Sequence, residues 1–60
     1  MTFRELEKLL ISNGWYHYRT RGSHYIYKND NLNKTITVPN HKGDIKKGTL
    51  NSILKQARLK

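Results

Sequence analysis

The side chains that could do chemistry in this 60-residue chain are those of histidine, lysine, arginine, tyrosine and serine. The sequence has no cysteine nucleophile and no glycine-rich phosphate loop, and its four acidic residues are scattered rather than clustered as magnesium ligands. We therefore expect no metal site and no cofactor. The remaining side chains suit metal-free cleavage of RNA, in which the 2′-hydroxyl of the RNA is the nucleophile. That reaction needs a base, an acid for the leaving 5′-oxygen and positive charge near the phosphorus.

His24 is the best candidate for the base. It follows Gly22 and Ser23, which predict a tight turn, so its ring could reach outward from the start of a strand. An imidazole titrates near neutral pH and can take or give a proton there. Strict alternation puts His24 on the same side as Ile26, which looks like a core residue. Either His24 lies at the rim of the helix-covered face, or the turn breaks the alternation. The alternative to catalysis is a plain polar strand residue.

Several cationic side chains are candidates for contacts to RNA phosphates. Some are near His24 in the sequence, and others lie in a loop and at the start of the last predicted helix, where phosphate can bind a helix N-terminus. Each can equally be part of a solvated surface. The candidates for RNA binding are Arg19, Arg21, Lys28, His41, Lys42, Lys46 and Lys47.

The aromatic residues of the predicted strands have two possible roles. His17 stands between Tyr16 and Tyr18 in mid-strand and is either structural or in contact with RNA. Tyr16 and Tyr18 point to one side of their strand, as Tyr25 and Tyr27 do in the next. Such rings can stack on unpaired bases or form cross-strand pairs that stabilise a small sheet. We expect a structural role for at least half of the tyrosines.

Net charge is the strongest signal about partners. Twelve Lys and Arg residues against four Asp and Glu residues give 12 − 4 = +8. This charge suits RNA, an acidic protein or an anionic membrane surface. No segment is long and apolar enough to span a membrane, and no secretory leader is evident. We expect a cytoplasmic protein.

The sequence predicts two helices and three strands in one domain, residues 1–60. Thr2 and Glu5 have the spacing of a capping box, and Asn13-Gly14 ends the first helix. The expected strands are 15–21, 24–28 and 34–38, and Trp15 is expected in the core. An apolar stripe predicts a second helix around residues 50–57, with Thr49 as a candidate cap. The fold class is α+β, in α-β-β-β-α order, with a three-stranded antiparallel sheet and both helices on one face.

Motifs along nearly the whole chain resemble the HicA toxin family. They are Asn13-Gly14-Trp15, Arg19, Arg21-Gly22-Ser23-His24, Thr37-Val38-Pro39, His41, Lys47-Gly48-Thr49-Leu50 and Ser52-Ile53-Leu54-Lys55-Gln56-Ala57. The resemblance implies a double-stranded-RNA-binding-domain-like fold and a toxin that cleaves single-stranded mRNA. It identifies His24 as the catalytic histidine, presented by Gly22 and Ser23. Members often have a glycine where this chain has Arg58, which affects how the last helix ends.

The resemblance also implies a protein partner, an antitoxin of the HicB type that covers the active site. We expect a monomer when the toxin is free and a hetero-oligomer with the antitoxin. Two other functions remain open. One is a basic RNA-binding module without catalysis, and the other is a docking surface for an acidic protein only.

Overall fold

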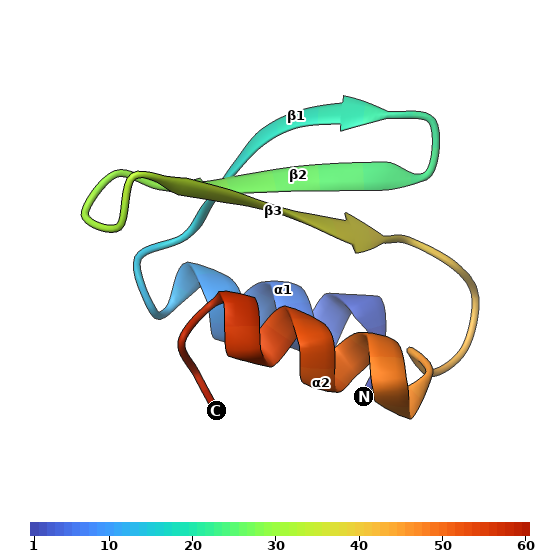
Figure 1. Cartoon of the computed structure of the whole chain (residues 1–60). Helices are drawn as coiled ribbons and strands as arrows, with labels where there is room; N and C mark the ends of the chain where they lie inside the picture. The colour runs from blue at the N-terminus through green and yellow to red at the C-terminus, as the bar shows by residue number, and fades with distance from the viewer.

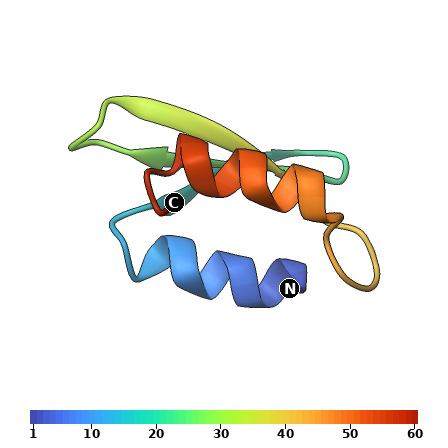
Figure 2. The ribbon, with the colours of Figure 1, turned by 60° about the horizontal axis from the view of Figure 1, so that its bottom comes forward.

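The predicted order of helices and strands is confirmed. The computed structural model describes all 60 residues, and a three-stranded sheet lies over two helices (Figure 1). The strands are antiparallel in the order β1-β2-β3. Both helices lie on the same side of the sheet, so its other face is uncovered (Figures 1 and 2). The elements are α1 (Phe3–Ile11), β1 (Tyr16–Arg21), β2 (His24–Asn29), β3 (Lys34–Pro39) and α2 (Lys47–Gln56).

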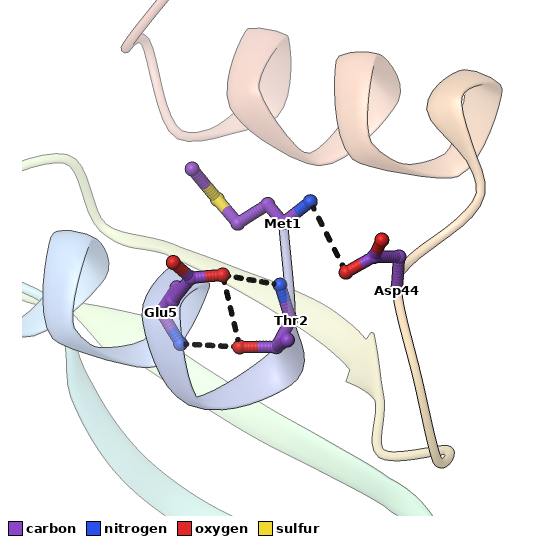
Figure 3. A network of polar contacts seen from close by, with 4 residues as sticks. All are labelled: Met1, Thr2, Glu5 and Asp44. Carbon is purple, nitrogen blue, oxygen red and sulfur yellow. Dashed lines mark hydrogen bonds and ion pairs between the residues drawn. The ribbon is translucent and has the colours of Figure 1, made fainter.

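The predicted capping box starts α1. The Thr2 backbone N–H donates to Glu5 Oε1 at 2.8 Å, and the Glu5 N–H donates to Thr2 Oγ1 at 3.2 Å (Figure 3). The N-terminal amine lies 3.7 Å from Asp44 Oδ1, and the Ile45 N–H donates to the Met1 carbonyl at 2.8 Å. These contacts attach the start of the chain to the loop before α2.

The capping box makes the stability of the fold depend on pH, through the ionisation of Glu5. Hydrogen bonds from the Thr2 N–H and then the Thr2 hydroxyl lower the pKa of Glu5 below its ordinary value. A lowered folded-state pKa adds stability above the unfolded pKa, and this is lost as pH falls through the folded pKa. Wild type should therefore exceed Glu5→Gln in stability at pH 7, and the difference should shrink as the pH falls below the ordinary glutamate pKa of about 4.3 and vanish below the lowered folded-state pKa. Urea unfolding of the wild type and of Glu5→Gln, at pH 7 and again below the folded-state pKa of Glu5, measures the stability difference. An equal difference at the two pH values would contradict the prediction.

The prediction that Thr49 caps the second helix is wrong. Helix α2 begins at Lys47, because Lys46 has an extended backbone and its carbonyl accepts the Leu50 N–H at 2.8 Å. Thr49 lies inside the first turn, and no side chain caps the helix.

The core lies between the sheet and the helices. In β2 and β3, Tyr25 pairs with Val38 and Tyr27 with Ile36, and all four side chains face the helices. Trp15 is buried as predicted. The buried apolar residues are Leu6, Leu10, Trp15, Tyr27, Ile36, Val38, Ile53 and Ala57.

Both helices end in the same backbone motif with different residues. After α1, the Trp15 N–H donates to the Leu10 carbonyl at 3.0 Å, and Gly14 has φ +91°. After α2, the Leu59 N–H donates to the Leu54 carbonyl at 2.8 Å, and Arg58 has φ +60°. This is the Schellman geometry, whose left-handed residue is usually glycine. Arg58 thus ends the helix in the usual way but with a strained backbone.

Arg58→Gly should raise the free energy of unfolding by about 0.5–1 kcal/mol. Loss of Cβ removes roughly 1–2 kcal/mol of left-handed strain, and the freer unfolded glycine offsets about 0.5–1 kcal/mol of this gain. Arg58→Ala is the matched control, since it removes the charge but keeps the strain. Urea unfolding of both variants measures the effect, and an equal gain in both would assign it to the charge instead.

Candidate active site

The uncovered face of the sheet carries His24 in a shallow hollow. We call this face the outer face. His24 is the first residue of β2 and is exposed, and the hollow is lined by Arg21, His24, Ile26 and Thr37. The outer-face residues, from strand register and alternation, include Arg19, Arg21, His24, Ile26, Lys28, Thr35, Thr37 and Pro39.

Neither placement considered for His24 from the sequence is correct. The alternation is intact, so His24 does share a face with Ile26 as predicted. However, Ile26 is not a core residue, because Tyr25 and Tyr27 face the helices instead. Ile26 is half-buried between its neighbours on the outer face. His24 therefore lies fully on the open side of the sheet, not at the rim of the covered side.

The turn that presents His24 is fixed at both of its central residues. Gly22 has φ +58°, and a positive φ at the first central position of a two-residue hairpin favours glycine. The Ser23 carbonyl accepts the Asn40 N–H at 2.8 Å, which ties the turn to the end of β3. His24 itself pairs with Arg21 on one side and Pro39 on the other. The base candidate is thus held by all three strands.

Three of the predicted phosphate-binding residues share the outer face with His24. Arg21 lies directly opposite His24 in the β1–β2 pairing, and Arg19 lies opposite Ile26. Lys28 is at the other end of β2, where its Nζ is 4.0 Å from Asp30 Oδ1. Arg21 and His24 line the same hollow, so a guanidinium that can bind a phosphate lies next to the imidazole.

The other four predicted RNA-binding residues lie outside the three strands of the sheet. His41 lines a groove with the start of α1 and Tyr25, and a further hollow with Lys42, Asp44 and Lys46. Lys47 is the first residue of α2. The loop that carries them leaves β3 at Pro39, which is paired with His24, so they belong to the same end of the sheet (Figure 1).

His17 has a structural role on the helix-facing side. Its Nε2 is 2.6 Å from Thr20 Oγ1, and its ring centroid is 5.1 Å from that of Tyr25 and 5.7 Å from that of Tyr27. The Tyr27 hydroxyl donates a hydrogen bond to Glu7, and burial followed by this bond raises the Tyr27 pKa. Tyr25 and Tyr27 are thus structural, as expected for half of the tyrosines.

The sequence interpretation missed Thr37 and the position of Ile26 in the hollow. Thr37 pairs with Ile26 across β2 and β3, so its hydroxyl is on the face of His24. The alternation of Ile36 and Val38 with Thr35 and Thr37 was the signal that could have placed Thr37 on this face.

No group of three or more His, Asp or Glu side chains is arranged to hold a metal ion. No helix has the length and apolarity needed to cross a membrane.

Comparison with known proteins identifies a family that the chain matches. A family profile described as "HicA toxin of bacterial toxin-antitoxin" matches residues 3–59. No curated protein and no solved structure matches significantly. The profile covers nearly the entire chain, including the Gly22-Ser23-His24 turn and the last helix. The chain therefore belongs to the HicA family of toxins of bacterial toxin–antitoxin systems.

Proposed function

We propose that this chain is an endoribonuclease that cleaves single-stranded mRNA without a metal ion, with His24 as general base. The observation that carries the proposal is the hollow itself. An exposed imidazole and a guanidinium lie side by side on an uncovered, cationic sheet face. Membership of a toxin family supports a role that damages the cell, and mRNA cleavage in the cytoplasm is such a role.

The proposed reaction starts at the RNA 2′-hydroxyl. His24 removes the proton of this hydroxyl, and the 2′-oxygen forms a bond to the adjacent phosphorus. Arg21 stabilises the negative charge that gathers on the phosphate oxygens during attack. The bond from phosphorus to the 5′-oxygen then breaks, and that oxygen takes a proton. The products are a 2′,3′-cyclic phosphate and a 5′-hydroxyl, with no water consumed in this step.

We also propose that an antitoxin of the HicB type binds the outer face and blocks the hollow. A chain with a net charge of +8 and an open basic surface favours a partner with an acidic or phosphate-like surface. The free toxin acts as a monomer in this proposal, because all the residues assigned to the reaction come from one hairpin.

The test is cleavage of a single-stranded RNA in excess EDTA, followed by analysis of the product ends. We expect cleavage that leaves cyclic phosphate and 5′-hydroxyl ends. A requirement for a divalent metal, or 5′-phosphate ends, would contradict the proposed mechanism. RNA binding without cleavage would favour the non-catalytic RNA-binding module instead.

A further inference from the structure

Two exposed tyrosines lie near Lys28, at the end of the sheet away from His24. Tyr16 is 41% exposed and Tyr18 is 53% exposed, which makes them the most exposed aromatic residues. Tyr16 pairs directly with Lys28, and Lys28 Nζ lies 5.3 Å from the centroid of the Tyr18 ring. The Tyr16 hydroxyl donates to Asp30 Oδ1 at 3.1 Å. The proposed reaction does not use any of these side chains.

An irregularity in β1 puts Tyr18 beside Lys28. The register with β2 shifts between His17 and Arg19, so Tyr18 is an extra residue without a partner. His17 pairs with Tyr27 and faces the helices, whereas Arg19 pairs with Ile26 and faces outward. Such bulges redirect side chains and often occur next to functional sites. Here the bulge adds a second aromatic ring next to the cation of Lys28.

Tyr16 and Tyr18 are not part of the hydrophobic core. The tyrosines that stabilise the fold are Tyr25 and Tyr27, which pack on the other face with α1 and β3. About half of the surface of Tyr16 and of Tyr18 remains in water and free to contact a ligand. Flat aromatic surface next to positive charge is the combination that binds single-stranded nucleic acid by stacking and by phosphate contacts.

We propose that Tyr18 and Tyr16 form a stacking subsite for an unpaired base of the RNA, with Lys28 binding a neighbouring phosphate. This inference rests on the proposed function, since it extends the RNA path from His24 along β2. His24 and Lys28 are four residues apart, or about 14 Å at a strand rise of about 3.4 Å per residue. Stacked nucleotides of one strand are spaced by about 3.4 Å, so the bound base is more than one nucleotide from the cleaved bond.

Binding of a fully 2′-O-methylated single-stranded RNA tests the subsite separately from cleavage, because this probe has no 2′-hydroxyl nucleophile. Tyr18→Ala should weaken its binding by about 5- to 150-fold, as expected for one lost base–aromatic stack, whereas Tyr18→Phe keeps the ring and should stay within about twofold. Ile11→Ala is the matched control, since Ile11 is 55% exposed and lies on α1. Unchanged binding by Tyr18→Ala, or equal losses in the Ala and Phe variants, would overturn the proposal.

Salt dependence distinguishes stacking from phosphate contact. Lys28→Gln should reduce the slope of log affinity against log salt by about 0.7, the value for one phosphate on a single strand. Tyr18→Ala should leave the slope unchanged. A duplex of the same sequence should bind Tyr18→Ala and wild type equally, because its bases are already paired. If the probe binds as described but natural RNA is not cut in EDTA, the subsite stands and the catalytic proposal fails.

Discussion

His24→Ala should reduce the rate of RNA cleavage by about 10²- to 10⁴-fold, the usual contribution of a general base. The ring is exposed at the start of β2 and makes no part of the core, so its removal should leave the fold intact. Binding of RNA should change little, because the positive charges proposed to contact the phosphates are those of Arg19, Arg21 and Lys28, which this variant keeps. Single-turnover cleavage in EDTA measures the loss, with circular dichroism to confirm folding.

The matched control is His41→Ala. His41 is also an exposed histidine at the same end of the sheet, but it lines the groove beside α1 rather than the outer-face hollow. This variant should cleave RNA at close to the wild-type rate. If His24→Ala cuts as fast as wild type while His41→Ala does not, the groove lined by Thr2, Arg4 and His41 becomes the site of the reaction. If both variants lose activity, His41 also takes part, either in RNA binding or as the acid for the leaving oxygen, and the affinity for uncleavable RNA distinguishes the two roles.

Local signals predicted the helices, strands and turns because each depends on a few neighbouring residues. Thr2 and Glu5 form the capping box at their predicted spacing, and Gly14 takes the left-handed conformation that ends α1. Gly22 has the positive φ that its turn needs. The prediction of a cap at Thr49 was wrong because the helix begins earlier. Lys46 is the N-cap of α2, and no side chain caps the helix.

The sequence could not show which face of β2 is buried. Alternation separates His24, Ile26 and Lys28 from Tyr25 and Tyr27 but does not orient either set. Ile26 is more apolar than the two tyrosines, and so the sequence suggested that its face of β2, rather than theirs, is the buried one. The orientation depends on register with β3, whose Ile36 and Val38 face the helices and bring the two tyrosines with them. Register of this kind is a long-range property, and so is the bulge at Tyr18.

Leu10→Ala should destabilise the fold enough to remove the site altogether. Leu10 is completely buried in the core, and its carbonyl accepts the Trp15 N–H that ends α1. Truncation of a buried leucine costs about 2–5 kcal/mol in lost burial and residual cavity. A domain of this size with no disulfide rarely has more than about 3–5 kcal/mol from a single core. We therefore expect the variant to be largely unfolded at 37 °C.

Trp15 makes this prediction measurable, because it is the only tryptophan and is 2% exposed in the folded protein. Urea titration followed by its fluorescence gives the free energy of unfolding directly. Ile11→Ala, one position further along α1 and exposed, is the control and should change stability by less than about 0.5 kcal/mol. A loss below about 1 kcal/mol for Leu10→Ala would contradict the packing described here. A partner that binds only the folded state stabilises that state. The proposed antitoxin, bound at the outer face, should therefore restore folding of Leu10→Ala, so that the stability of the core and the binding of the partner are energetically coupled.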